Sequence, residues 1–236
     1  MTGGGGSPVP QGRGIIRGNS SLKPESSVTG EIGFNWHHDH WRASLSGYVT
    51  DFKDRISEIR SCESANANRQ DVSTWQCYDA NGTVYMFISD RENIDKAQIK
   101  GIEASLDYEL NPYVTLEANY THATSKIKGG QWDGQPLNAI PKHVANLGMR
   151  YKLNDKINLW QNVHYRSKTS PYLGRARMSD SNPAYTFFDV GMNMDVAKNT
   201  KLKFGVYNLL DKKAENASGD VLLDGRRYGL SLTTSF

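Results

Sequence analysis

The chain has 236 residues, 22% of them charged, with a formal net charge of +3 at pH 7. This charge is too small to favour nucleic-acid binding, and no run of about 18 apolar residues predicts a membrane helix. The mean hydropathy of −0.62 does not exclude a membrane barrel, because barrel strands need only about 9–11 residues of alternating polarity.

The first 27 residues predict an irregular leader. Four consecutive glycines, Gly3 to Gly6, are followed by Pro8 and Pro10, a composition that is typical of flexible loops. Neither the basic region nor the apolar region of a signal peptide is visible here. We therefore expect the chain to begin partway through a longer protein, with residues 1–27 as a loop and 28–236 as one structural unit.

Beyond the leader, apolar and polar residues alternate with period two, which predicts β-strands, and no segment predicts a convincing helix. In the fourth strand, for example, Val114 and Leu116 share one face and Thr115 and Glu117 the other. We expect the third strand to fall into two parts around Asp90. The nine predicted strands cover about 28–36, 41–50, 84–110, 114–121, 145–151, 157–166, 188–195, 202–209 and 228–236.

The last nine residues carry the strongest single signal. One face of this strand is mostly apolar and the other is small or polar, with Tyr228, Leu230, Leu232 and Phe236 opposite Gly229, Ser231, Thr233 and Ser235. Chain termini usually fray, so a well-formed final strand ending on an aromatic residue is unusual for a soluble domain. It is typical of an outer-membrane barrel, which is apolar outside and polar inside.

The connections between strands alternate in length. Tight turns follow the first, third, fifth and seventh strands, and long segments at about 60–83, 125–142, 167–184 and 211–226 follow the others. Short periplasmic turns that alternate with long extracellular loops are typical of transmembrane barrels. A soluble sandwich would show mostly short turns. The polar faces, including Glu117, Asn119, Arg150, Asn162 and Asp189, are then expected to line a wet interior.

The two cysteines, Cys62 and Cys77, lie 15 positions apart in one polar loop. A pair that closes a single loop suits an oxidising compartment, so we predict a disulfide rather than two separate thiols. In the chain-entropy model, closing a loop of this length contributes about 3 kcal/mol. The Cα atoms are then expected to lie roughly 4.4–6.8 Å apart.

No residue pattern predicts catalysis. A metal site at His37, His38, Asp39 and His40 is disfavoured, because adjacent residues of a tight turn point apart. No nucleotide motif, Ser/His/Asp set or paired-carboxylate site appears in a supporting context. We therefore expect no catalytic residue, no metal and no cofactor.

Four segments, in order along the chain, resemble motifs of TonB-dependent outer-membrane receptors. Ser20 stands where the family has Pro, and Leu210 stands where it has Phe. The segments are Gly18 to Glu25, Asn93 to Ala104, Val206 to Lys212 and Gly225 to Phe236. The resemblance implies a barrel of 22 strands filled by an amino-terminal plug. Here it implies the last nine strands, without the plug and without the segment that engages TonB.

The fold class expected is therefore all-β, a transmembrane antiparallel β-barrel segment of about nine strands. Residues 1–27 become an extracellular loop or irregular leader, and 28–236 the carboxyl-terminal barrel portion. The resemblance places the protein in the outer membrane of a Gram-negative bacterium, in contact with lipid and lipopolysaccharide. It also implies TonB as the energy-transducing partner, acting through a region that this sequence lacks, and no nucleic acid as a partner.

Receptors of this family take up ferric siderophores, cobalamin, haem or sugars, and an anionic ferric catecholate suits the arginines of the loop at 167–184. Arginine offers charge, forked donors and a face for aromatic rings. The alternative for this basic loop is contact with lipopolysaccharide, and the alternative for the aromatics of the cysteine loop is the interfacial girdle. The residues expected to bind ligand are Arg166, Lys168, Tyr172, Arg175 and Arg177, with Arg69, Trp75 and Tyr78 from the cysteine loop.

Other functions remain open at this point. Within transport, the ligand could be haem, cobalamin or another chelate. In a different class, the chain could be an outer-membrane barrel enzyme such as a phospholipase or protease, but no nucleophile and base are evident on adjacent strands. A soluble β-sandwich adhesion module is a third possibility, which partitioning into detergent would separate from a barrel.

Overall fold

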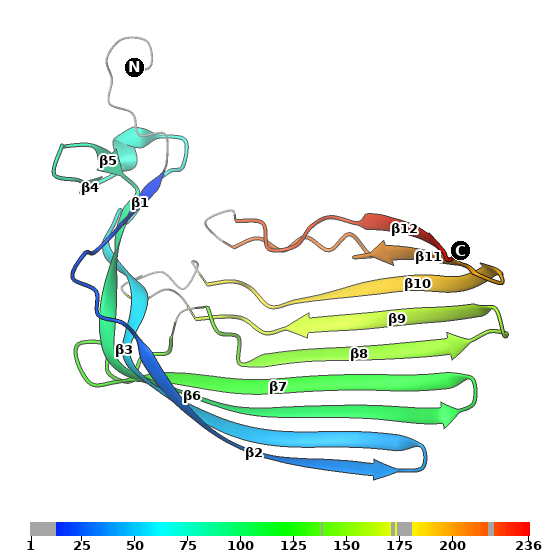
Figure 1. The fold of residues 1–236 in the computed structure, drawn as a ribbon. Coiled ribbons are helices and arrows are strands. Elements are labelled where there is room, and N and C mark those ends of the chain that lie inside the picture. Colours follow the sequence, from blue (N-terminus) through cyan, green and yellow to red (C-terminus); the bar gives the residue numbers. More distant parts are fainter. Residues whose placement is uncertain (1–12, 138, 171–172, 174–180, 217–219) are drawn as a thin grey trace.

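A computed structural model describes residues 13–137, 139–170, 173, 181–216 and 220–236 (Figure 1). Its twelve strands are β1 (Gly14–Arg17), β2 (Ser26–His38), β3 (Trp41–Glu63), β4 (Cys77–Tyr78), β5 (Val84–Tyr85), β6 (Phe87–Asn111), β7 (Val114–Lys128), β8 (His143–Lys152), β9 (Ile157–Arg166), β10 (Tyr185–Ala197), β11 (Thr200–Tyr207) and β12 (Arg227–Thr234). The helix of this described part is a single 3₁₀ turn, η1 (Val72–Thr74). No helix there has the length and apolar character needed to cross a membrane.

Nine strands form one continuous antiparallel path in the order β12-β11-β10-β9-β8-β7-β6-β3-β2. They correspond to the nine strands predicted from sequence. β4 and β5 form a separate two-stranded hairpin within the cysteine loop. The prediction of an all-β, antiparallel sheet is confirmed along this path.

β1 departs from the prediction, because it lies in the leader and pairs with β6 in parallel. β7 pairs with β6 only from Lys96 onward, so the segment Phe87 to Asp90 would otherwise expose a free edge. β1 pairs with the main-chain N–H and C=O groups along that edge, which proteins rarely leave unpaired. The sheet is therefore antiparallel apart from this one four-residue pairing, which the sequence did not predict.

The predicted break at Asp90 is also wrong. The interruption falls at Met86, between β5 and β6, and Asp90 lies within a 25-residue strand. β3 is likewise longer than predicted, with 23 residues, so β3 and β6 run together well beyond the other strands (Figure 1).

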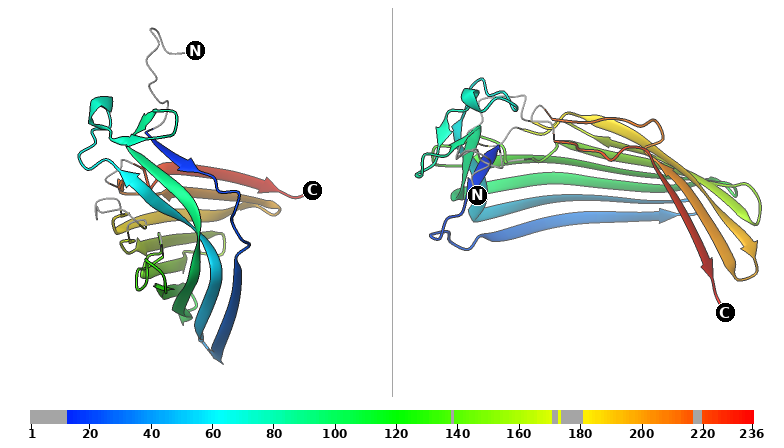
Figure 2. Two further views of the ribbon diagram at one scale, coloured as in Figure 1. Left: turned by 90° about the vertical axis from the view of Figure 1, so that its left-hand side faces the viewer. Right: turned by 90° about the horizontal axis from the view of Figure 1, so that it is seen from above.

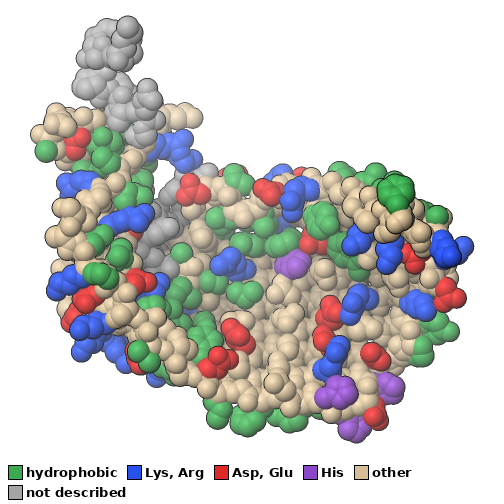
Figure 3. Space-filling view, in the orientation of Figure 1, with side chains coloured by type: hydrophobic (Ala, Val, Ile, Leu, Met, Phe, Trp, Pro, Cys, Tyr) green, Lys and Arg blue, Asp and Glu red, His purple; other side chains and the backbone are tan. Residues whose placement is uncertain are grey.

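The sheet is curved into a trough, with β2 and β12 at its two margins (Figure 2). Tight turns join the strands at one end, here called the turn end, and long connections leave from the other, the loop end (Figure 1). This alternation agrees with the sequence. Figure 3 looks into the concave side of the trough, where the floor is mostly polar. This concave side is called the inner face.

The opposite, outer face carries the apolar halves of the strands. Large hydrophobic side chains are exposed there along successive strands, as expected where lipid rather than protein covers them. They include Ile32, Phe34, Trp36, Leu45, Ile102, Leu106, Leu147, Phe204, Leu230 and Leu232. On the inner face, Arg150 pairs with Glu117, two residues that the alternation had placed inward.

Candidate functional site

A buried apolar cluster lies on the inner face at the loop end, where connecting segments fold onto it. Phe52, Ala97 and Ile127 face one another across β3, β6 and β7. Leu137 and Leu173 come from the segments at 129–142 and 167–184, and each is at most 5% exposed within the same cluster. Two loops thus turn inward and cover this part of the trough.

Hydrogen bonds fix both loops to the strands beneath them. Leu137 donates its main-chain N–H to Oγ of Ser125 at 2.8 Å, and Oγ of Ser170 donates to the carbonyl of Leu137 at 3.0 Å. The N–H of Arg60 donates to the carbonyl of Leu173 at 2.9 Å. The 167–184 segment therefore reaches from β9 across the trough to β3.

The start of this basic segment is exposed at the loop end. Arg166 ends β9 and is exposed, as is Lys168. Between them, Ser167 donates its N–H to the carbonyl of His143 at 2.9 Å and accepts the N–H of His143 on its own Oγ. Tyr172, Arg175 and Arg177, also predicted to bind ligand, lie outside the described residues.

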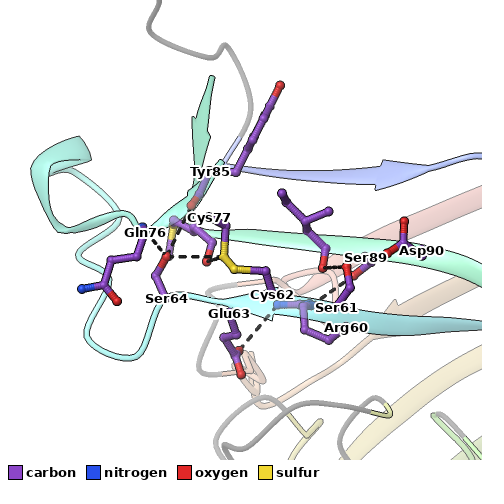
Figure 4. The surroundings of a disulfide bond; sticks show 12 residues. Arg60, Ser61, Cys62, Glu63, Ser64, Gln76, Cys77, Tyr85, Ser89 and Asp90 are labelled. Atoms are coloured by element: carbon purple, nitrogen blue, oxygen red, sulfur yellow. Dashed lines mark hydrogen bonds and ion pairs between the residues drawn. A yellow bond between two sulfur atoms is a disulfide. The ribbon is translucent and has the colours of Figure 1, made fainter. Parts of the chain in front are cut away.

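The cysteine loop is built around a disulfide (Figure 4). Cys62 and Cys77 are bonded, with their Cα atoms 5.8 Å apart, inside the range expected from the sequence. Oγ of the buried Ser64 accepts the N–H of Gln76 at 2.7 Å, which holds the two arms of the loop together next to the sulfur atoms.

The predicted ligand residues of this loop occupy different environments. Trp75 is 5% exposed, and its indole N–H donates to the carbonyl of Asn68 at 2.8 Å, so it stabilises the loop from within. Tyr78 is 64% exposed. Arg69 is half-buried. Tyr78 and Arg69 are therefore the members of this set that an incoming ligand could reach.

Arg60 lies at the junction of the two loops. Its side chain is 3% exposed, Nε donates to Oγ of Ser89 at 3.0 Å, and Nη1 lies 3.5 Å from the carboxylate of Glu63. Its guanidinium also lies 3.6 Å from the centroid of the Phe87 ring. A buried cation with these partners is a fixed structural element, and it holds β3 to β6 directly below the disulfide (Figure 4).

A polar network that the alternation pattern alone does not predict crosses the inner face of β8, β9 and β10. Nδ1 of His164 lies 2.6 Å from Oδ1 of Asn146, and Nε2 lies 3.0 Å from Oδ2 of Asp189. Asp189 in turn accepts the N–H of Asn208 at 2.8 Å. Alternation places all three strand residues inward, but only the pairing register brings them together.

Asn208 continues the network into the loop at 211–226. Its amide donates to the carbonyls of Lys212 and Asp224 at 3.0 and 2.8 Å. Oδ1 of Asp211 accepts the N–H of Arg226 at 2.9 Å, and this bond, aided by the ammonium of Lys213, holds the pKa of Asp211 below its usual range. Residues from the two segments that resemble family motifs, 206–212 and 225–236, thus hold this loop in place together.

A groove of about 230 Å³ lies beneath the same loop. Phe187, Tyr207 and Arg227 contribute to its walls, with the carboxylate of Asp224 at 3.8 Å from Nε of Arg227. Across the described part of the chain, no group of three or more His, Cys, Asp or Glu side chains is arranged to hold a metal ion. The histidines at 37, 38 and 40 are exposed around a tight turn.

Comparison with known proteins agrees with this architecture. A family model described as "TonB dependent receptor-like, beta-barrel" matches residues 1–209. An iron-regulated outer membrane virulence protein of Vibrio cholerae is 34% identical over 227 residues, which cover 95% of this chain and 33% of that protein. A ferric enterobactin receptor of Pseudomonas aeruginosa is 30% identical over 243 residues, which cover 94% of this chain and 31% of that protein.

Among solved structures, a mutant of a ferric enterobactin receptor from Pseudomonas aeruginosa superposes with a TM-score of 0.66 at 28% identity. The superposition covers 94% of this chain and 32% of that one. The chain therefore spans about a third of the length of the relatives that it matches.

Proposed function

Because the chain belongs to the TonB-dependent receptor-like β-barrel family, we propose that it forms part of an outer-membrane receptor that imports ferric siderophores. The favoured ligand class is an anionic ferric catecholate, and the energy for import comes through TonB. The relative of 30% identity and the superposed structure are both named as ferric enterobactin receptors of Pseudomonas aeruginosa, which supports a ferric complex as the ligand.

The observation that carries the proposal is the contact of the basic segment with the end of β3 that leads into the cysteine loop. Leu173 of the basic segment forms a bridge with Ile59 of β3, about a hundred residues earlier in the sequence and three residues before Cys62. The Arg60 to Leu173 hydrogen bond lies beside it. Side chains of both loops can therefore meet one ligand above the trough.

The chemistry of these side chains suits an anion with aromatic rings. Arg166 and Lys168 supply exposed positive charge at the base of the segment, and Tyr78 supplies an exposed ring. We propose that Tyr172, Arg175, Arg177 and Arg69 complete the site, with Trp75 supporting the cysteine loop from inside. Guanidinium groups provide charge-assisted hydrogen bonds to an anionic chelate and stacking on its rings.

The test is uptake of labelled iron by a Gram-negative strain that lacks its own catecholate receptors and produces the receptor carrying this chain. Iron supplied as a ferric catecholate should enter cells that have TonB and stay outside cells that lack it. A hydroxamate complex serves as the specificity control. Uptake of haem or cobalamin in place of the catecholate would reassign the ligand, and equal uptake without TonB would reject energised import.

A further inference from the structure

Two histidines face each other across β7 and β8 on the outer face of the sheet. His122 and His143 are partners in the strand register, and the Nδ1 atoms of the two rings lie 3.3 Å apart. Ala123 donates its N–H to the carbonyl of Lys142, so the next pair along the strands carries the hydrogen bonds. The histidines therefore form the closer, non-hydrogen-bonded kind of pair. These two residues are called the histidine pair.

A third polar group approaches the histidine pair. The hydroxyl of Tyr120, two residues before His122 on the same face of β7, lies 2.7 Å from Nδ1 of His143. A ring nitrogen of a neutral histidine carries either one proton or one lone pair, so it makes one good hydrogen bond. Nδ1 of His143 nevertheless has two partners, the hydroxyl and the ring nitrogen of His122. Hydrogen bonds alone therefore do not satisfy this cluster, whereas a metal ion between the two rings would use a lone pair from each.

The separation of the two ring nitrogens fits a single metal ion. Two histidine nitrogens that each lie about 2.0–2.1 Å from one tetrahedral Zn²⁺ ion are about 3.3 Å apart. The histidine pair has this separation already. The χ2 torsion of histidine is broad, so both lone pairs can turn towards one ion without a change of the backbone. The main chain of His143 is also fixed on its other side, by the hydrogen bonds that it exchanges with Ser167.

The surroundings of the histidine pair decide which kind of ion suits it. Ile102 faces His122 from β6, and exposed apolar side chains continue from there along β6 to Leu110, a surface called the outer apolar belt. Towards the loop end, Lys100 faces Thr124. An apolar border and a nearby ammonium group do not favour Ca²⁺ or Mg²⁺, which need several oxygen ligands. Imidazole nitrogens instead suit Zn²⁺, Ni²⁺ and Cu²⁺.

We propose that His122 and His143 bind one divalent transition-metal ion, Zn²⁺, Ni²⁺ or Cu²⁺, through their Nδ1 atoms at the loop-end border of the outer apolar belt. Water completes the coordination, and the hydroxyl of Tyr120 hydrogen-bonds to that water. The ion joins β7 to β8 beside the start of the basic segment. The site lies on the outer face, away from the residues proposed to bind the siderophore, so it does not depend on which ligand the receptor imports.

The experiment counts bound Zn²⁺ by native mass spectrometry of the full receptor carrying this chain, purified in detergent and stripped of metal with a chelator. Zn²⁺ alone is the probe, titrated at neutral pH, and Ca²⁺ is the comparison. The test variants are His122→Gln, His143→Gln and the double variant. His40→Gln, at an exposed position of the turn end, is the matched control that also removes one imidazole.

Each single variant and the double variant should lose the same one Zn²⁺ ion. The midpoint of that binding step should rise at least about tenfold, because the loss of even a supporting partner of a metal ligand costs about 10–100-fold in affinity. The control should bind as the unmodified receptor does, and Ca²⁺ should not occupy the site. Binding should weaken in acid, where protons compete for the ring nitrogens.

A second readout identifies the ligand atoms. Electron paramagnetic resonance of Cu²⁺ added at one equivalent should show coupling to two nitrogen nuclei, and the double variant should lose this signal. Zn²⁺ binding that is unchanged in both single variants, a double variant that loses two ions, or a Cu²⁺ spectrum that is the same with and without the histidine pair would overturn the proposal. Siderophore uptake should persist in every variant, which separates this test from that of the proposed function.

Discussion

Lys23 and Asn93 are joined by a reciprocal pair of hydrogen bonds. The N–H of Lys23 donates to Oδ1 of Asn93 at 2.7 Å, and Nδ2 of Asn93 donates back to the carbonyl of Lys23 at 2.9 Å. The same amide nitrogen also donates to the carbonyl of Asp54 at 2.6 Å. The two segments that resemble family motifs in the first half of the chain are therefore one structural unit that ties the leader to β3 and β6.

Replacing Asn93 with Ala should detach this leader. The change removes all three hydrogen bonds and leaves two carbonyls and one N–H without those partners, which costs about 1–3 kcal/mol. Hydrogen exchange of the amides at 19–25 should accelerate, while that of β9 and β10 stays unchanged. Asn35→Ala, at an exposed position of β2, is the matched control. Unaltered exchange at 19–25 would show that other contacts hold the leader.

Removing the disulfide should loosen only the cysteine loop. A Cys62→Ser, Cys77→Ser variant loses the closure of a 15-residue loop, worth about 3 kcal/mol in the chain-entropy model. Limited proteolysis should then cut within residues 64–85, while the nine-strand path remains resistant. In the unmodified chain, alkylation without reductant should leave its mass unchanged, and two alkylated thiols under that condition would contradict the disulfide.

The attachment of β1 should depend on pH in the acid range. The guanidinium of Arg17 donates to both oxygens of Asp90 at 2.6 and 2.8 Å, and this pairing lowers the pKa of Asp90. A carboxyl with a lowered folded pKa stabilises above its unfolded value of about 3.9 and loses that contribution as the pH falls through the folded value. Exchange at 14–17 should rise below about pH 4, and in Asp90→Asn it should be raised already at neutral pH.

Ligand affinity should depend on the basic segment. Changing Arg175 and Arg177 to Ala should weaken siderophore binding at least about tenfold, because each charge-assisted contact contributes on the order of 1.5–3 kcal/mol. The loss should shrink as salt rises, since exposed charges are screened. A Lys212→Ala, Lys213→Ala variant, in the charge-balanced segment at 211–227, is the control. Normal affinity with normal surface expression would assign these arginines to lipopolysaccharide instead.

The two faces of β6 and β7 should respond oppositely to a new charge. Leu106 is 42% exposed in the middle of the outer apolar belt, and Leu106→Arg should cost about 2–4 kcal/mol in a bilayer. Asn119→Arg places the same charge on the inner face, where polar residues already lie, and should be tolerated. Unboiled gel electrophoresis measures the folded fraction of each variant in outer membranes. Equal folded fractions would contradict the assignment of the two faces.

The sequence by itself determined which residues share a face and which connections are long. Period-two alternation requires no knowledge of partners, so residues such as Leu45, Leu106 and Glu117 could be assigned to a face from their neighbours alone. The spacing of Cys62 and Cys77 within one polar loop likewise pointed to a local closure.

Only the tertiary structure decided what depends on register and on contacts between distant segments. Asn146, His164 and Asp189 each looked like an ordinary inward polar residue, and pairing aligned them into one network. β1 was not predictable, because its strand forms to cover an edge of β6 that exists only once β7 has ended. Strand pairing decides which residues of neighbouring strands lie side by side, whereas a single sequence specifies only the alternation along each strand.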